Sequence, residues 1–213
     1  MDKVFKLCVA GKDQYTCSAA LTLPASIYEM VDMAERVGLE KVEELYFEVE
    51  KSYRGEYLVN ALKWNATLPE LNILAWKVAE MDEGQEAILE GLIKMEQKKQ
   101  DVPWLPYPKL LQLAENTACC HRVPQARNDS QLGRFYAENG FVEGVDDLPD
   151  RLFELLDFEK IGRDARLAEG GVFTEDSGYV VRHQELKELE KLPDLIICRP
   201  YYTMLLELSL LHP

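Results

Sequence analysis

The spacing of hydrophobic residues changes along this chain, and the change limits the folds open to it. Up to about residue 66, apolar side chains alternate with polar ones in short runs, for example at residues 45–50. Such alternation is typical of half-buried strands. From Leu68 the apolar residues recur every three or four positions, as they do on one face of a helix. Separate blocks with the two periods predict an α+β fold with several small domains.

The first block, residues 1–66, is predicted to be a small α+β domain. A helix is expected between its strands, with Pro24 in the first turn and Gly38 after its end. Three short runs have strand character, and the first two are expected to pair: residues 4–10, 18–23 and 45–50.

The second block, residues 67–107, is predicted to be helical. Two runs with helical spacing are separated by the break Asp82-Glu83-Gly84, which suggests a helical hairpin. Residues 101–108 contain three prolines. Because proline removes a backbone donor and clashes inside a helix, this stretch is predicted to be a stiff connector.

The third block, residues 108–213, is predicted to be an α+β domain. A β-hairpin is expected from residues 172–174 and 178–181, which follow a Gly-Gly pair. Residues 195–198 and 201–211 are apolar and fit either strands or a terminal helix. Helices are expected at about residues 109–117, 130–138, 149–156, 159–168 and 184–191.

The chain is strongly acidic, with 38 Asp and Glu against 24 Lys and Arg and a net charge of −14. Such a surface repels nucleic acid and anionic lipid, so the expected partner is a basic protein surface. No apolar run reaches the ~18 residues of a membrane span, and residues 1–6 lack the features of a signal peptide. The five cysteines are an odd number at irregular spacing, which argues against a disulfide framework. A cytoplasmic protein is expected.

The acid is concentrated between Glu138 and Glu159, where eight carboxylates accompany one base, Arg151. If Pro149 opens a helix, three acids form one stripe on it: Asp150, Glu154 and Asp157. On spacing alone, an ordinary solvated helix face is favoured over a binding face. The preceding pair Asp146 and Asp147 favours the binding face, because the pair is not needed for the helix dipole. The same helix is expected to turn three leucines toward a core: Leu152, Leu155 and Leu156.

Candidates for a metal or catalytic site are few. Cys119-Cys120-His121 is the one cluster of soft ligands, but adjacent cysteines point apart, so a packed turn is favoured over a zinc site. The other cysteines, Cys8, Cys17 and Cys198, offer no partner pair. No nucleophile or phosphate-loop motif is found. We therefore expect no enzyme activity, cofactor or metal, although chemistry by paired carboxylates stays open as an alternative.

A resemblance extends from about Asn128 to Val181. It is carried by Gly-Arg-Phe-Tyr from Gly133, Leu-Asp-Phe-Glu-Lys-Ile-Gly-Arg-Asp from Leu156, Gly-Gly-Val-Phe-Thr from Gly170 and Gly-Tyr-Val from Gly178. In this order the motifs resemble the ArdA-type antirestriction family. The run Leu-Pro-Ala-Ser-Ile-Tyr-Glu from Leu23 resembles the N-terminal part of versions found in Gram-positive mobile elements such as conjugative transposons.

The resemblance implies a function. Proteins of this family imitate B-form DNA and occupy the DNA-binding site of type I restriction–modification enzymes. They are elongated, with three small domains and a dimer contact in the last part. The family's antirestriction motif matches residues from about Gly144 to Leu167. The candidate DNA-mimic face here comprises Glu138, Glu143, Asp146, Asp147, Asp150, Glu154, Asp157, Glu159 and Asp164.

The charge also bears on size and partners. B-DNA carries one charge per ~1.7 Å of axis, so a net charge of −14 matches at most about 24 Å of duplex. A homodimer doubles this to about 48 Å. The alternative is an acidic interaction module that binds another basic, DNA-binding protein. Nucleic acid and membranes are not expected as partners.

Overall fold

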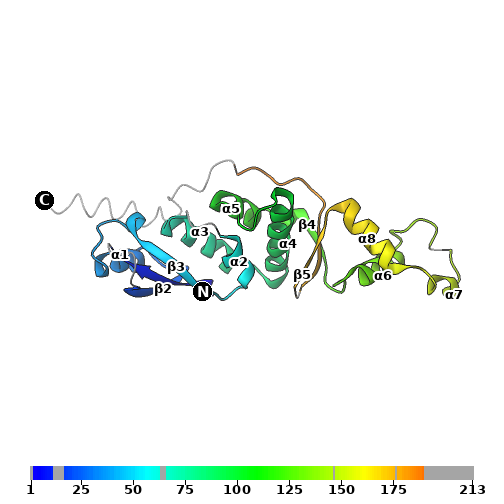
Figure 1. Ribbon diagram of the computed structural model, residues 1–213, viewed down its shortest axis with the longest axis horizontal. Coiled ribbons are helices and arrows are strands. Elements are labelled where there is room, and N and C mark those ends of the chain that lie inside the picture. Colours follow the sequence, from blue (N-terminus) through cyan, green and yellow to red (C-terminus); the bar gives the residue numbers. More distant parts are fainter. Residues whose placement is uncertain (1, 12–16, 63–65, 146, 176, 190–213) are drawn as a thin grey trace. The chain divides into compact units, whose positions relative to one another are not determined.

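The computed structural model describes residues 2–11, 17–62, 66–145, 147–175 and 177–189 (Figure 1). The described residues form two compact units. Unit 1 contains residues 2–80, Trp104–Ala114 and 187–189, and unit 2 contains Met81–Pro103 and Glu115–Leu186, apart from the gaps. The chain therefore enters unit 1 three times. The predicted domain boundaries near residues 66 and 107 stay predictions.

The described residues have a mixed α+β fold, as expected, with eight α-helices and two three-stranded antiparallel sheets. None of the helices in the described ranges combines the length and the hydropathy needed to cross a membrane.

The sheet of unit 1 has the order β2-β1-β3, with β1 spanning Phe5–Ala10, β2 Ala19–Leu23 and β3 Tyr46–Ser52. Its central strand buries Phe5, Leu7 and Val9 completely. The alternate residues of that strand face away from the core, which is the arrangement that the period of two predicted. All three predicted strands and the pairing of the first two are confirmed.

Helix α1, Ile27–Arg36, begins at a capping box formed by Ser26 and Glu29. The Leu23–Pro24 peptide bond is cis, and Pro24 lies before the cap. The expectation that Pro24 occupies the first helical turn is therefore wrong. The Ser26 hydroxyl satisfies a free backbone N–H at the helix start, which proline does not do. A short 3₁₀ turn, η1, follows at Val42–Glu44.

Helix α3, Leu68–Ala79, begins at a second capping box, Thr67 with Glu70. The Asn72 side chain on this helix is buried and bonds both backbone groups of Ala25, at 2.8 Å and 2.9 Å. These bonds tie α3 to the start of α1. The short helix α2, Glu56–Ala61, was not predicted.

The connector at residues 101–108 is anchored in unit 1 at its far end. The Leu105 N–H donates to the Ala61 carbonyl at 2.7 Å, and Leu105 pairs with Leu62 in an isolated bridge. Helix α5 then starts at Tyr107 and runs to Glu115, earlier than predicted, because Pro108 fits its first turn.

Unit 2 is built on a sheet with the order β4-β6-β5, and helix α4, Glu83–Gln100, packs against it. Strands β5, Val172–Thr174, and β6, Gly178–Arg182, form the predicted hairpin. Strand β4, Cys120–Val123, was missed because it is only four residues long. A Cβ at Gly91 of α4 would lie 2.6 Å from the Val180 Cβ, so this glycine lets the helix approach the sheet.

Three further helices follow β4: α6, Asp129–Glu138, α7, Asp150–Phe153, and α8, Phe158–Glu169. Helices α6 and α8 lie side by side (Figure 1). Their backbones touch at two glycines, since a Cβ at Gly133 would lie 1.9 Å from the Phe158 carbonyl oxygen. A Cβ at Gly162 would lie equally close, at 1.9 Å, to the Asp129 carbonyl oxygen.

Two predicted helices differ from the structure. The helix expected at residues 149–156 is only four residues long, and Leu152 and Leu155 are 49% and 79% exposed instead of facing a core. The described residues 184–189 are not helical. There the Lys187 carbonyl accepts a hydrogen bond from the Gln112 side chain of α5. In a helix, this carbonyl would instead accept from a backbone N–H four residues later. The segments 195–198 and 201–211 lie outside the described residues.

The expectation about cysteines is wrong in part. Cys8 and Cys17 form a disulfide, with their Cα atoms 5.5 Å apart. Cys8 lies on β1, and Cys17 precedes β2, the strand that pairs with β1. Strand pairing therefore brings together two thiols whose spacing in the sequence carried no signal.

Candidate acidic interaction surface

The candidate acidic residues lie on α6, α7, α8 and the loops between them, within unit 2. Asp146 is outside the described residues. The other eight are all exposed, which is the minimum that a binding face requires: Glu138, Glu143, Asp147, Asp150, Glu154, Asp157, Glu159 and Asp164. We call these eight residues the acidic surface.

Arg134 of α6 partly neutralises this surface. Its guanidinium lies 2.5 Å from the Glu154 carboxylate and 3.4 Å from that of Glu138. It also lies over the Phe158 ring, 5.0 Å from its centroid. The hydrogen bond with Glu154 raises the pKa of Arg134 above its usual value. Arg134 thus links α6 to the end of α7, and two of the eight carboxylates already have a cationic partner.

Two other members of the acidic surface serve helix α8. Asp157 is its N-cap, and the side chain accepts a hydrogen bond from the Lys160 N–H at 3.0 Å. Glu159 lies in the first turn, where a negative charge is favourable near the helix dipole. Its carboxylate is 4.0 Å from the Arg163 guanidinium. Both residues thus have a structural role as well as an exposed charge.

The remaining four carboxylates are the most available to a partner. Within the described ranges, Glu143, Asp147, Asp150 and Asp164 make no ion pair. Three of them fall on the loop before α7 and at its first residue, where Arg151 is the nearest base in sequence. On α8, by contrast, Lys160 and Arg163 are exposed among the acids. The uncompensated charge is therefore densest before α7.

The predicted stripe of Asp150, Glu154 and Asp157 does not lie on one helix. Asp150 begins α7, Glu154 is its C-cap and Asp157 caps the next helix. All three are exposed, so the expected solvent face exists, but a turn between two helices carries it. The prediction that these three acids face solvent is confirmed. The prediction that they form a regular stripe on one helix is wrong, because α7 ends after one turn.

The support beneath this surface was not predicted. The Arg166 guanidinium donates two hydrogen bonds to the Asp129 carboxylate, at 2.7 Å and 2.9 Å, and so clamps α8 to the start of α6. These bonds hold the pKa of the Asp129 carboxyl below its usual value. The glycines at 133 and 162, each inside a helical pattern, were the available signal of a close helix contact.

A second link joins α6 and the sheet to the end of α8. The hydroxyls of Tyr136 and Tyr179 both donate to the Glu169 carboxylate, at 2.8 Å and 3.0 Å. Burial raises the pKa of both tyrosines, and the Glu169 carboxylate adds to this. Tyr179 also packs in a core with Val123, Ala126 and Leu132. This core holds α6 against the sheet, and the bonds to Glu169 add the end of α8.

We expect Asp129→Asn to lower the free energy of unfolding by about 1–2 kcal/mol at pH 7, because a charged hydrogen-bond pair is lost. The folded-state pKa of Asp129 lies below the unfolded value, so its contribution is present above the unfolded pKa. That contribution disappears as the pH falls through the folded pKa. The measurement is denaturant unfolding at pH 7 and pH 3. The difference in unfolding free energy between Asp129→Asn and wild type should be smaller at pH 3 than at pH 7.

The control for this measurement is Asp164→Asn, an exposed carboxylate of α8. It should change the unfolding free energy by less than about 0.5 kcal/mol. If Asp129→Asn lowered the unfolding free energy equally at the two pH values, the charged pair would not be the source of the stabilisation.

In the cluster Cys119-Cys120-His121 the two sulfurs lie 3.8 Å apart, so the expectation that adjacent cysteines point apart is wrong here. Cys119 ends the 3₁₀ turn η2, Thr117–Cys119, and Cys120 begins β4, with both thiols buried. Burial, together with the neighbouring Cys119, raises the pKa of the Cys120 thiol to about 12. His121 is exposed and stacks on His183, with ring centroids 3.9 Å apart. The packed turn that was predicted fits these positions.

The carboxyl groups with shifted pKa values bear on acid–base chemistry. In the described part of the chain, the two shifts are both downward, at Glu29 from bonding to Ser26 and at Asp129 from Arg166. A lowered pKa stabilises the charged form, whereas a general acid requires a raised one. Neither residue has the properties of a catalytic acid.

No protein-family model matches this chain, and no curated protein matches it.

Proposed function

We propose that this chain is an antirestriction protein of the ArdA type, which occupies the DNA-binding site of type I restriction–modification enzymes. One observation carries the proposal. The carboxylates that coincide with the family's antirestriction motif are exposed wherever they are described, and two of them, Asp147 before α7 and Asp150 at its start, make no ion pair within the described ranges. The proposal includes a cytoplasmic, non-enzymatic protein, an elongated arrangement of small domains and a homodimer.

The proposed mechanism is electrostatic. Lys and Arg side chains that bind phosphates in the target enzyme would bind the carboxylates of the acidic surface instead. Long-range attraction would accelerate the encounter, and salt would weaken it. No base sequence is read in such a contact, so one inhibitor would act on enzymes with different recognition sequences.

The test is a titration of the purified chain into a type I enzyme with unmodified target DNA. We expect DNA binding and cleavage to fall at stoichiometric concentrations, and the inhibition to weaken as salt rises from about 50 to 200 mM. Poly-glutamate at the same carboxylate concentration is the control for a general polyanion effect. Full DNA binding and cleavage with several type I enzymes would refute the proposal.

A second candidate is an interaction module for another basic, DNA-binding protein. Leu155, which is 79% exposed, lies beside Glu154, and Leu152 is 49% exposed. A surface that imitates only phosphates does not need apolar side chains, whereas protein interfaces often combine them with charge. Leu155→Ser separates the candidates, because it should weaken binding to such a module's partner and leave inhibition of the restriction enzyme nearly unchanged.

A further inference from the structure

The disulfide of unit 1 lies beside a carboxylate. The Sγ atoms of Cys8 and Cys17 and a carboxylate oxygen of Glu50 all lie within 4.8 Å of one another. Cys8 is half-buried, and Cys17 and Glu50 are exposed. Once the disulfide is reduced, two cysteine thiolates and a carboxylate are ligand types that zinc uses in proteins. Among the described residues, this is the group of metal-ligating side chains that comes together.

The backbone explains how Glu50 reaches the cysteines. In the β1–β3 pairing, Leu7 is opposite Val49, whereas Lys6 is opposite Lys51. Glu50 is therefore the extra residue of a β-bulge, at the point where the register shifts. Bulges turn a side chain out of the regular alternation and are frequent at functional sites. Here the bulge lies one residue from Cys8 on the neighbouring strand.

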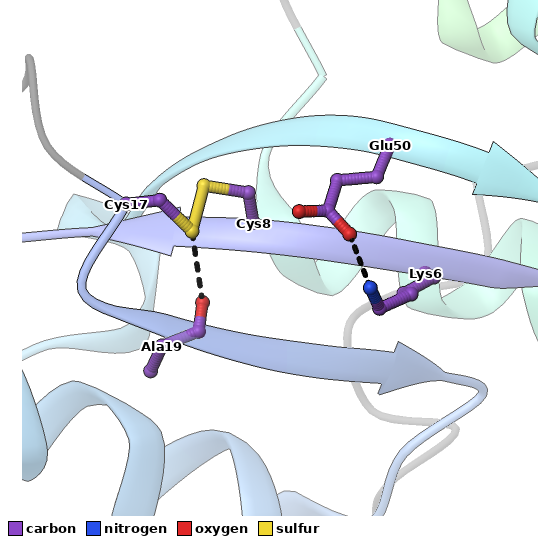
Figure 2. Close-up of a disulfide and its surroundings, with 5 residues drawn as sticks. All are labelled: Lys6, Cys8, Cys17, Ala19 and Glu50. Atoms are coloured by element: carbon purple, nitrogen blue, oxygen red, sulfur yellow. Dashed lines mark hydrogen bonds and ion pairs between the residues drawn. A yellow bond between two sulfur atoms is a disulfide. The ribbon is translucent and has the colours of Figure 1, made fainter.

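The two oxygens of Glu50 have different surroundings. Oε2 is 2.6 Å from the Lys6 ammonium. Figure 2 shows the other oxygen on the side of the disulfide, so the carboxylate lies between Lys6 and the two sulfurs. A carboxylate held in this way is oriented as metal-binding carboxylates are by their hydrogen-bond partners.

We propose that Cys8, Cys17 and Glu50 form a redox-gated zinc site. The oxidised pair is the disulfide. A thiol reductant breaks the Cys8–Cys17 bond by thiol–disulfide exchange. Two reductant thiols are oxidised to a disulfide, and the two cysteines are released as thiols. One Zn²⁺ then binds both sulfurs and one oxygen of Glu50, and two thiol protons pass to solvent. Water fills the fourth position.

Geometry and charge support this site. One tetrahedral ion that binds two sulfurs at ~2.3 Å holds them about 3.8 Å apart, so the two thiolates must separate after the disulfide is reduced, and their Cα atoms, 5.5 Å apart, keep them close enough to share the ion. Two thiolates and a carboxylate carry −3, so the zinc complex carries −1, and the adjacent Lys6 ammonium balances it. The exposed Cys17 gives a reductant access to the disulfide. In a reducing compartment the dithiol is the prevailing form.

The test compares the oxidised and the reduced full chain in a titration with Co²⁺, whose thiolate complexes absorb strongly, followed by displacement with Zn²⁺. We expect the reduced chain to bind one equivalent with a thiolate–cobalt absorption band and the oxidised chain to show none. Cys8→Ser and Cys17→Ser should each weaken binding at least about 100-fold, and Glu50→Gln about 10-fold. The matched control Glu40→Gln, an exposed glutamate of the same unit, should leave binding unchanged.

Several outcomes would overturn the proposal. One is a reduced chain that binds metal no more tightly than the oxidised chain. Another is equal binding by wild type and the Cys8→Ser variant, which would move the site to Cys119, Cys120 or Cys198. If Glu50→Gln matched Glu40→Gln, the carboxylate would not be a ligand. The comparison of redox states uses one chain, so it stays decisive even if a cysteine variant fails to fold.

Discussion

Neutralising the five acids from Asp146 to Asp157 should weaken inhibition of a type I restriction enzyme by at least about 100-fold. The variant combines Asp146→Asn, Asp147→Asn, Asp150→Asn, Glu154→Gln and Asp157→Asn. An exposed charge pair contributes about 0.5–1 kcal/mol, so five lost contacts amount to a factor of this size. The measurement is the inhibitor concentration that halves DNA binding, at low and at physiological salt.

The fold should survive these changes. Asn is as good an N-cap as Asp, so the start of α8 at residue 157 is kept. The ion pair between Arg134 and Glu154 is exposed, and its loss costs little stability. Circular dichroism and thermal unfolding should therefore resemble those of wild type.

The matched control removes the same charge from unit 1. Five exposed glutamates are replaced by glutamine: Glu35, Glu40, Glu44, Glu48 and Glu56. Both variants change the net charge from −14 by +5, to −9. Inhibition by the control should stay within about threefold of wild type. An equal loss in the two variants would show that total charge matters and that the acidic surface is not a specific binding face.

Gly133→Ala should lower the free energy of unfolding by about 1–2 kcal/mol. A Cβ there would lie 1.9 Å from the Phe158 carbonyl oxygen and 2.7 Å from the Gly162 nitrogen. Backbone atoms cannot move aside as a flexible side chain can, so the two helices must separate. Overpacking of this kind costs about 1–3 kcal/mol or more, and it outweighs the helix propensity of ~1 kcal/mol gained over glycine. Denaturant unfolding measures the difference.

Gly162→Ala should have a similar effect, and the two changes should not add. Both enlarge the same contact between α6 and α8, so once the helices separate, the second methyl group meets less resistance. Gly84→Ala in α4 is the control, because a Cβ there meets the Asp82 side chain and no backbone. It should not lower the free energy of unfolding, because alanine gains up to ~1 kcal/mol of helix propensity there without a clash with the backbone. Strict additivity of the two glycine variants would contradict a shared contact.

For the acidic surface, the sequence predicted the exposure of the carboxylates but not their arrangement. Carboxylate density between Glu138 and Glu159 was sufficient to predict an exposed, charged region, because ionised groups are rarely buried without partners. Spacing was not sufficient to predict its shape. Seven residues from Asp150 were compatible with a helix of two turns, but the leucines among them found no core, and α7 ended after one turn.

Local signals accounted for most of the elements. The strand character of β1 and β3 and the glycine-rich approach to β5 depend on neighbours in sequence, so they were predicted from the chain alone, whereas the capping boxes before α1 and α3 were not. Strand β4 and helix α2 are too short for a clear periodicity, and they were missed.

Contacts between distant residues were accessible only through tertiary structure. The Cys8–Cys17 disulfide, the bulge that aims Glu50, the Arg166–Asp129 clamp and the glycine contact of α6 with α8 all join different elements. One physical reason explains why none of these contacts could be predicted from the sequence. Side-chain chemistry and hydrophobic period specify which face of an element is buried, but the partner on that face is chosen by how the whole chain packs.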